Sequence, residues 1–312
     1  MAATRVAEIE GRELKLTNLD KVLYPEAGFT KAEVIDYYAR VAPAMVPHTS
    51  GRALTLRRFP EGVDQTDKAF FEKRCPKHRP DWVKTATVLA GERAGNIDFC
   101  VCDDLPTLVW MAQLAAIELH PSLSLAKQPE RPTVLAFDLD PGPPADIIDC
   151  CRIAMRLREL FAHFELECFP KTSGSKGLQL YVPLNLKTDY DETKPFARAI
   201  AQLFEQQSPD EVVSKMSKDL RKGKVFIDWS QNHQRKTTIC AYSLRARERP
   251  TASTPVTWKE VERALAKADA ELLTFEAGEV LKRVERSGDH FAPVLELKQR
   301  LPKFADIIGE AE

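Results

Sequence analysis

The alternation of strand-type and helix-type segments between residues 133 and 229 constrains the fold more than any other feature. Runs of strand-forming residues and one apolar helical stripe follow each other in a fixed order. The expected strands are Thr133–Asp138, Glu165–Lys171, Leu178–Pro183 and Val225–Trp229, and the expected helices are Pro144–Phe164 and one or two within 192–219. This β-α-β-β-α-β order predicts an α+β ferredoxin-like unit, an antiparallel sheet with its helices on one face.

The residues before this unit predict a second module of short strands and helices. Thr30 and Glu33 form a capping box, and apolar residues at helical spacing follow it to about Met45. Residues 105–119 are apolar nearly all round, which predicts a central buried helix that ends near Pro121. We therefore expect an N-terminal α/β module over 1–130 and a catalytic core over 131–312, packed together as one globular unit.

Charge and hydropathy narrow the class of protein. The chain has 312 residues, and 45 Lys and Arg against 46 Asp and Glu give a net charge of −1. Two windows are locally basic, with a net charge of +4 over 52–84 and +7 over 215–249. A binding site for a polyanion would therefore be a local patch. The N-terminus has no apolar signal segment, and 105–119 is too short to span a bilayer, so a cytoplasmic protein without a membrane partner is expected.

Seven cysteines occur without the spacing of a disulfide framework. Cys100, Cys102, Cys150 and Cys151 are expected to be buried free thiols of a reducing compartment. A zinc site is the alternative, with the ligands Cys75, His78, Cys100 and Cys102. The spacing of the second pair disfavours it.

Three aspartates could carry metal chemistry. Asp138 and Asp140 end the first core strand, where residues i and i+2 point to the same side. Two close carboxylates repel each other unless cations such as Mg²⁺ or Mn²⁺ lie between them, although a surface acidic turn is the alternative. Asp228 interrupts an apolar run in the fourth strand, which can neighbour the first. A third carboxylate there suits two-metal phosphoryl or nucleotidyl transfer, with a salt bridge to a nearby arginine as the alternative.

Weaker signals lie in a turn, a helix end and an aromatic pair. The turn Ser173–Gly177 offers backbone N–H groups and the charge of Lys176 to a phosphate, or is a plain hairpin turn. His120 at the end of the expected helix could cap its carbonyls. Phe70 and Phe71 lie in a basic window, where they could stack on bases or belong to the core.

Taken in order along the chain, seven segments resemble the polymerase domain of bacterial DNA ligase D, a member of the archaeo-eukaryotic primase superfamily. They are LTNLDKVLYPEAGFTK (16–31), FFEK (70–73), ELHP (118–121), FDLDPG (137–142), TSGSKGLQLY (172–181), KVFIDWSQN (224–232) and YSLRAR (242–247). The resemblance covers about 10–300 and is specific because FDLDP, SGSKG and FIDWSQN occur together. It implies a primase-like core with an antiparallel sheet.

The resemblance also implies roles for individual residues. The catalytic and metal-binding carboxylates would be Asp138, Asp140 and Asp228. Nucleotide-binding residues would be His120, Ser173, Ser175, Lys176, Arg221, Gln231 and Arg245. DNA-binding residues would be Lys21, Lys31, Arg57, Arg58, Phe70, Phe71 and Lys73, with Lys21 and Lys31 on a 5′-phosphate. The expected cofactors are two Mn²⁺ or Mg²⁺ ions, and the substrates are NTPs or dNTPs.

The implied activity is template-directed filling of gaps and extension of ends in non-homologous end joining, with a preference for ribonucleotides. Expected partners are DNA ends, gapped duplex with a 5′-phosphate, Ku and a DNA ligase, in a bacterial, nucleoid-associated setting. The segment 63–70 is longer than the family pattern, and the Lys-x-Asp-Gly ligase signature is absent, so this chain does not itself seal nicks. A phosphohydrolase is one alternative, although Pro141 and Gly142 follow where a hydroxyl residue is needed. A catalytically silent nucleic-acid binder is the other, against which the three intact carboxylates argue.

Overall fold

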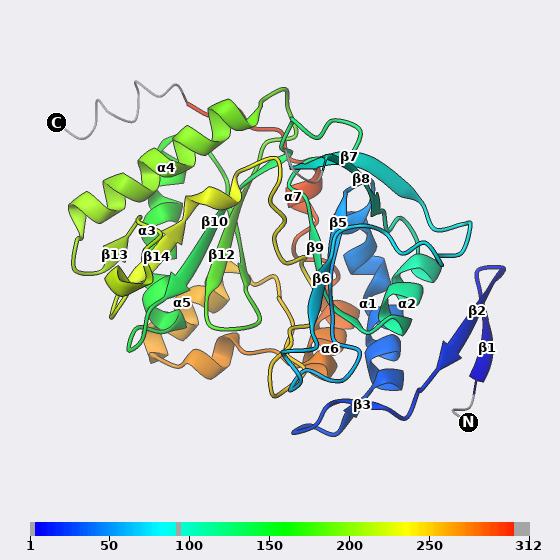
Figure 1. Cartoon of the computed structure of the whole chain (residues 1–312). Coiled ribbons are helices and arrows are strands. Elements are labelled where there is room, and N and C mark those ends of the chain that lie inside the picture. Colours follow the sequence, from blue (N-terminus) through cyan, green and yellow to red (C-terminus); the bar gives the residue numbers. More distant parts are fainter. Residues whose placement is uncertain (1–3, 92–94, 303–312) are drawn as a thin grey trace. The chain divides into compact units, whose positions relative to one another are not determined.

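The computed structural model describes residues 4–91 and 95–302, which divide between two compact units (Figure 1). Unit 1 is formed by 1–127, 237–254 and 275–289, and unit 2 by 128–236, 255–274 and 290–312. The expected boundary near residue 130 is close to the first change of unit. The two later segments that return to unit 1 differ from the expected division.

Unit 2 contains the ferredoxin-like order of elements that the sequence predicts. Its elements are β10 (Val134–Pro141), α3 (Ile147–His163), β11 (Phe169–Thr172), β12 (Leu178–Pro183), α4 (Tyr190–Gln207), β13 (Val212–Val213), the 3₁₀ helix η1 (Lys218–Leu220), β14 (Val225–Asp228), η2 (Trp229–Gln231), α5 (Trp258–Lys267), η3 (Ala270–Leu273) and α7 (Pro293–Glu296). The strand order is β11-β12-β10-β14-β13. The first and fourth strands of the predicted unit, β10 and β14, are neighbours as expected, and β13 adds a short parallel edge strand.

The two faces of this sheet differ in chemistry. The ring of Phe137 on β10 packs against Phe161 of α3 at 5.4 Å between centroids, and the Cys150 thiol of α3 contacts the Leu139 carbonyl oxygen. Because side chains alternate along a strand, Asp138 and Asp140 point away from α3. The helix begins at a capping box formed by Asp146 and Asp149. Because α3 packs on one face of the sheet, the carboxylates of Asp138 and Asp140 lie on the opposite face.

Unit 1 contains a five-stranded sheet and three helices within its described residues. Its elements are β1 (Thr4–Ile9), β2 (Arg12–Thr17), β3 (Val22–Tyr24), β4 (Phe29–Thr30), α1 (Lys31–Thr49), β5 (Leu54–Arg58), β6 (Phe70–Glu72), β7 (Thr85–Gly91), β8 (Gly95–Cys100), α2 (Leu105–Gln113), β9 (Ala116–Pro121) and α6 (Ala277–Ser287). The sheet runs β6-β5-β8-β7, with β9 also paired to β5. The capping box at Thr30 and Glu33 is confirmed, and α1 extends four residues beyond the expected end.

The expected helix over 105–119 is wrong in its second half. Helix α2 ends at Gln113, Ala115 has a positive φ of 55°, and Ala116 starts strand β9. His120 therefore lies in a strand opposite Thr55 of β5 and does not cap a helix. An apolar run without periodicity fits a buried helix and a buried strand equally well. Pairing with β5 makes 116–121 a strand.

Helix α1 is tied to a segment from late in the chain. The Tyr37 hydroxyl donates to the Tyr242 carbonyl oxygen at 2.6 Å, and the Tyr38 hydroxyl donates to the Ile117 carbonyl oxygen at 2.5 Å. The Ser243 hydroxyl accepts the Leu119 N–H. These buried bonds join α1, β9 and 237–254 into one core.

The cysteines differ in part from expectation. Cys75 and Cys100 form a disulfide, so Cys100 is not the expected free thiol. Cys102, Cys150 and Cys151 are buried and free, as expected. The disulfide consumes two of the four ligands of the alternative zinc site. Across residues 4–91 and 95–302, no helix is both long and apolar enough to cross a membrane.

Candidate active site

The three aspartates meet on two neighbouring strands of unit 2. Asp138 of β10 lies directly opposite Asp228 of β14 in the antiparallel register, and Asp140 is two residues further along β10. Asp138 is half-buried, and its Oδ1 atom is buried without a hydrogen-bond partner. Burial, followed by repulsion from Asp140 and Asp228, raises the pKa of Asp138 to about 7. A buried carboxylate oxygen beside two other acids is an arrangement that a cation would stabilise.

The Asp228 carboxylate is held by donors of η2. Its Oδ1 accepts the Ser230 N–H at 2.9 Å and the Ser230 hydroxyl at 2.5 Å, and its Oδ2 accepts the Gln231 amide at 3.0 Å. These donors satisfy a side chain that is only 9% exposed. They take the place of the arginine salt bridge that was the alternative interpretation.

Two polar residues in line with the aspartates were missed by the sequence analysis. The register across the sheet places Lys171, Gln179, Asp138 and Asp228 in one row. Lys171 is fully buried, and its Nζ donates to Gln179 Oε1 at 2.5 Å. A lysine at the end of an expected strand looks solvent-exposed in sequence, so only the sheet register reveals it.

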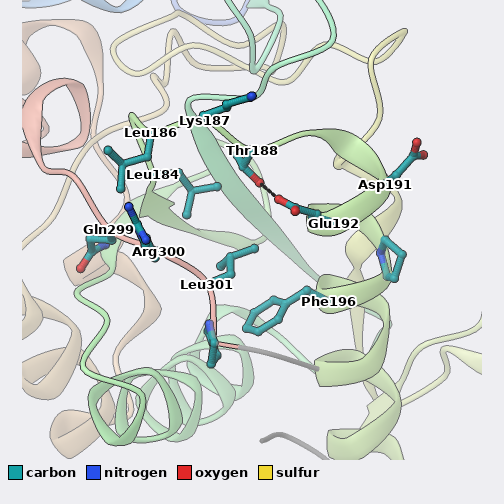
Figure 2. Close-up of a pocket in the computed structure, with 12 residues that line it drawn as sticks. Leu184, Leu186, Lys187, Thr188, Asp191, Glu192, Phe196, Gln299, Arg300 and Leu301 are labelled. Carbon is teal, nitrogen blue, oxygen red and sulfur yellow. Dashed lines mark hydrogen bonds between the residues drawn. The ribbon is translucent and has the colours of Figure 1, made fainter. Parts of the chain in front are cut away.

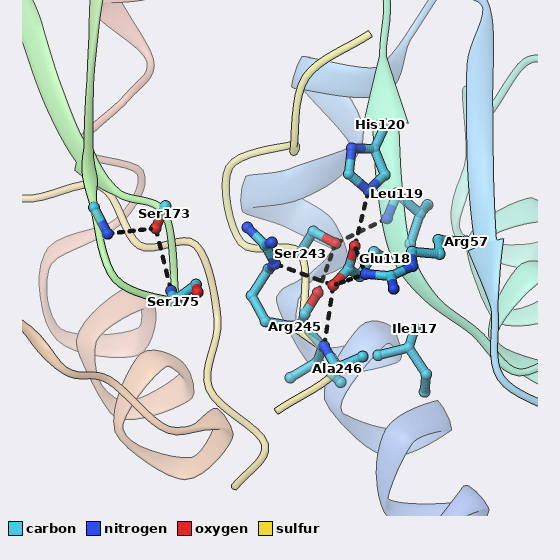
Figure 3. A network of polar contacts seen from close by, with 12 residues as sticks. Arg57, Ile117, Glu118, Leu119, His120, Ser173, Ser175, Ser243, Arg245 and Ala246 are labelled. Atoms are coloured by element: carbon cyan, nitrogen blue, oxygen red, sulfur yellow. Dashed lines mark hydrogen bonds and ion pairs between the residues drawn. The ribbon is translucent and has the colours of Figure 1, made fainter. Parts of the chain in front are cut away.

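The turn between β11 and β12 lies against the aspartate-bearing strand. Ser173 Oγ accepts the N–H groups of Ser175 at 3.2 Å and Gly177 at 3.0 Å, which closes the turn (Figure 3). A Cβ on Gly177 would lie 2.2 Å from the Leu139 carbonyl oxygen, so only glycine permits this approach to β10. Lys176 projects from the turn and is exposed. Ser173, Ser175 and Lys176 thus belong to the same sheet as the aspartates.

Arg221 approaches the same sheet from the loop before β14. Its guanidinium carbon is 3.8 Å from the centroid of the Phe226 ring, and Phe226 is opposite Asp140 in the register. One Nη donates to the Met216 carbonyl oxygen, and Nε is buried without a partner. A Cβ on Gly142 would lie 1.8 Å from the Arg221 carbonyl oxygen, so this glycine lets the loop pack on β10.

Unit 1 contains a buried charge network centred on Glu118, which the sequence analysis did not single out (Figure 3). Its carboxylate accepts the Arg245 Nε–H, the Ala246 N–H and a bond from His120 Nε2, each at 3.1 Å. Arg57 Nη1 is 3.4 Å from both oxygens. Burial opposes the charge of Glu118, but these donors hold its pKa well below the ordinary value. Burial lowers the pKa of His120, a shift that Glu118 opposes.

The expected DNA-binding aromatics flank this network. Phe70 and Phe71 on β6 are 42% and 61% exposed, so they do not belong to the core. The guanidinium of Arg58 lies over Phe70 at 5.2 Å, and that of Arg57 over Phe71 at 5.3 Å. Lys73, directly after β6, is exposed. Exposed rings beside cations are the arrangement that single-stranded nucleic acid binds.

Lys21 and Lys31 are brought together at the start of α1. The Lys31 N–H donates to the Lys21 carbonyl oxygen at 2.8 Å. Lys21 Nζ pairs with Glu61 at 2.8 Å, and Lys31 Nζ donates to the Thr17 carbonyl oxygen at 2.9 Å. Burial and the neighbouring charge of Lys21 lower the pKa of Lys31 to about 8.

The candidate residues thus form separate groups. Unit 2 holds the three aspartates, the turn residues, Arg221 and Gln231, whereas unit 1 holds His120, Arg245 and the residues expected to bind DNA. One cavity of about 770 Å³ in unit 2 is lined by residues near the end of β12, the start of α4 and 299–302 (Figure 2). None of its lining residues is among the predicted site residues.

The three aspartates form a donor set of the kind that a divalent cation requires. Three carboxylates on adjacent strands supply the oxygen ligands that Mg²⁺ and Mn²⁺ prefer, and Asp138 Oδ1 has no competing partner. Among the side chains the structure describes, no three His, Cys, Asp or Glu groups already adopt a metal-binding geometry. The oxygens of Asp228 face donors of η2. The residues therefore fit the ions in chemistry, whereas the carboxylates of the described residues are not oriented as a complete ligand set.

Comparison with known proteins defines the class as a primase-polymerase domain. The family model described as the LigD primase-polymerase domain matches residues 30–291. The chain therefore belongs to the LigD primase-polymerase domain family. Its fold matches a solved structure, the polymerase domain of Mycobacterium tuberculosis ligase D in complex with DNA, with a TM-score of 0.83 and 41% identity over 92% of this chain and 99% of that one.

Curated relatives are longer proteins. The chain is 43% identical to the multifunctional non-homologous end joining protein LigD of Mycolicibacterium smegmatis over 90% of its own length and 36% of that protein. It is 32% identical to the bifunctional LigD of Bacillus subtilis over 89% of its length and 44% of that protein. The chain thus spans less than half the length of these relatives.

Proposed function

We propose that this chain is a template-directed nucleotidyltransferase that fills gaps and extends DNA ends during non-homologous end joining. The observation that carries the proposal is the direct pairing of Asp138 with Asp228, with Asp140 on the same face of β10. We further propose that these three carboxylates hold two Mn²⁺ or Mg²⁺ ions. The substrates are an NTP or dNTP and a primed template.

The chain's own residues have distinct parts in this proposal. Bound ions would stabilise the charge that develops on the attacking and leaving oxygens. Ser230 and Gln231 keep the Asp228 carboxylate in place. The turn with Ser173, Ser175 and Lys176 offers the Lys176 cation and serine hydroxyls to phosphate oxygens, while the N–H groups of Ser175 and Gly177 are held by Ser173 Oγ. Arg221, His120 and Arg245 are further candidates for contacts with the nucleotide.

We assign DNA binding to unit 1. Phe70 and Phe71 provide exposed stacking surfaces, and Arg57, Arg58 and Lys73 supply positive charge beside them. Lys21 and Lys31 at the start of α1 bind a 5′-phosphate, because an anion is favoured at a helix N-terminus. The DNA-bound relative and the end-joining names of the longer relatives support this assignment. Ku and a DNA ligase are the proposed protein partners.

A preference for ribonucleotides is part of the proposal. The hydroxyl and amide groups around the carboxylates offer partners for a ribose 2′-OH, with Ser173 first among them. Asn232 is not one of them, because its amide bridges the Ala136 N–H and carbonyl oxygen within the sheet.

Primer extension on a gapped duplex tests the function. Asp228→Asn keeps the acceptor oxygen for Ser230 but removes the charge. It is expected to lower incorporation by more than about 100-fold, because even partners of metal ligands cost about 10- to 100-fold. Asp219→Asn, at an exposed position of η1, is the matched control. DNA binding should change by no more than a few-fold, and near-normal turnover by Asp228→Asn would refute the assignment.

A further inference from the structure

A buried lysine lies on β11, which is separated from the aspartate-bearing strand β10 by β12. Lys171 on β11 is 0% exposed. Burial of an ammonium group is costly unless it is paired and hydrogen-bonded. Lys171 Nζ lies 5.4 Å from the centroid of the Tyr181 ring and 2.5 Å from Gln179 Oε1. The sheet register places Gln179 directly between Lys171 and Asp138.

The hydrogen-bonding capacity of these groups fixes the orientation of the Gln179 amide. A lysine ammonium has three donors and no acceptor, so it can bind only the oxygen end of the amide. The NH₂ end must then face the other way, toward the carboxyl of Asp138, to which Gln179 donates a hydrogen bond. The Oδ1 atom of Asp138 stays buried without a partner. Lys171 thus determines which group the amide presents to the carboxyl.

We propose that Lys171 is a positioning residue for the metal site: it fixes the Gln179 amide, which holds the Asp138 carboxyl and leaves Oδ1 available to a divalent cation. This proposal rests on the proposed function, in which Asp138 is a metal ligand. In this role Lys171 acts on the site through Gln179. Without it, the amide of Gln179 can turn over and place its oxygen against the carboxylate.

The positioning role and a simple charge effect predict opposite changes in metal affinity when Lys171 is replaced. A lysine charge near the site repels a divalent cation, so loss of that charge alone would tighten metal binding. Loss of the positioning contact weakens it instead, because groups that orient a metal ligand typically account for about 10- to 100-fold in affinity. The direction of the change therefore separates the two explanations.

The test measures Mn²⁺ binding to the full chain without nucleotide or DNA, from the electron paramagnetic resonance signal of free Mn²⁺. Lys171→Met keeps the length of the side chain and removes its donors. Mn²⁺ affinity is expected to fall about 10- to 100-fold. Lys187→Met, which removes a lysine charge from an exposed position of the same unit, is the matched control and should bind Mn²⁺ as the unmodified chain does. An unchanged or tighter affinity in Lys171→Met overturns the proposal.

Primer extension adds a readout that a folding defect would not reproduce. With Lys171→Met, extension should be lost at limiting Mn²⁺ and return at saturating Mn²⁺, because only the occupancy of the site changes. Activity that stays low at saturating Mn²⁺ in a protein with unchanged Mn²⁺ affinity would contradict the positioning role.

A double variant keeps the proposal testable if Lys171→Met alone does not fold. Replacing both Lys171 and Gln179 by Met removes the two side chains of this buried hydrogen bond together, so neither is left without the other. If Lys171 acts through Gln179, the double variant binds Mn²⁺ as weakly as Gln179→Met does. A double variant with the affinity of the unmodified chain refutes the proposal.

Asp138→Asn separates the failure of this proposal from that of the proposed function. If Asp138→Asn abolishes Mn²⁺ binding and Lys171→Met leaves it intact, only the positioning role fails. If Asp138→Asn itself binds Mn²⁺ normally, the metal assignment of the proposed function fails, and the positioning role fails with it.

Discussion

Glu118→Gln removes one negative charge from a buried network with almost no change in side-chain shape. Glu118 is 2% exposed and accepts bonds from Arg245, Ala246 and His120. The new amide offers two donors where the carboxylate offered acceptors, so it opposes N–H groups that are themselves donors. The cations of Arg57 and Arg245 then lose their buried counter-charge.

The expected loss of stability is large for one isosteric change. Breaking a buried ion pair by removal of one partner costs about 3–5 kcal/mol, which lowers the melting temperature of a chain of 312 residues by about 5 to 8 °C. Glu72→Gln is the matched control, because Glu72 pairs with Arg58 at 2.9 Å but is about one-fifth exposed. Partly exposed pairs contribute about 0–1 kcal/mol. Chemical denaturation of the two variants and the unmodified chain measures the difference.

The destabilisation caused by Glu118→Gln should also depend on pH, in a direction that the lowered pKa of Glu118 determines. Because the folded pKa of Glu118 is lowered, its contribution is fully present above the ordinary glutamate value of 4.5 and is lost as the pH falls below it. The difference in unfolding free energy between the unmodified chain and Glu118→Gln should narrow by up to about 1.4 kcal/mol per pH unit in that range. A destabilisation below about 1 kcal/mol at neutral pH, or a difference that does not narrow on acidification, would refute the reasoning.

Three further predictions concern other sites. Raising the pH through about 8 should weaken the preference for 5′-phosphorylated over 5′-hydroxyl gaps, because Lys31 loses its charge. Gap-filling rates on the two kinds of gap measure this preference, and a preference that survives in the double variant Lys21→Ala and Lys31→Ala would place the 5′-phosphate at another site. Reduction of the disulfide between Cys75 and Cys100, 25 residues apart, should lower the free energy of unfolding by about 3.5 kcal/mol, whereas Cys75→Ser should not respond to dithiothreitol. The unmodified chain should favour rNTPs by about 5- to 150-fold in kcat/KM, and Ser173→Ala should reduce that ratio mainly by slowing rNTP use. Equal efficiency for both sugars in the unmodified chain would exclude the ribose contact.

The parts of the fold that could be predicted have a clear period in sequence. Alternating residues in 178–183 and an apolar helical stripe in 144–164 specified β12 and α3, and their order specified the sheet. The strand order makes β10 and β14 neighbours, and their register then places Asp138 opposite Asp228, so topology accounts for part of the carboxylate cluster and register for the rest. The strand β9 did not follow, because the apolar run 105–119 has no period that separates helix from strand.

Buried charges could not be predicted because their partners are distant in sequence. Glu118 is 127 residues from Arg245, and its charge is acceptable only when that contact forms. Lys171 is closer to Gln179, yet its burial depends on the sheet register and not on local pattern. The bond between Cys75 and Cys100 likewise requires the loop before β7 to reach the end of β8. Each of these contacts is a product of tertiary packing.

The return of the chain to unit 1 after residue 236 has a consequence for folding during synthesis. The Tyr37 hydroxyl finds its acceptor on Tyr242, 205 residues later in the chain. At about 5–20 residues per second, the ribosome needs about 10 to 40 s to make that stretch. During this time the core around α1 lacks the segment 237–254, which contains the hydrogen-bond acceptor of Tyr37, while the continuous stretch 128–236 that forms most of unit 2 is complete earlier. The N-terminal third of a nascent chain should therefore stay sensitive to proteases, and dependent on chaperones, until residues 237–254 have left the ribosome.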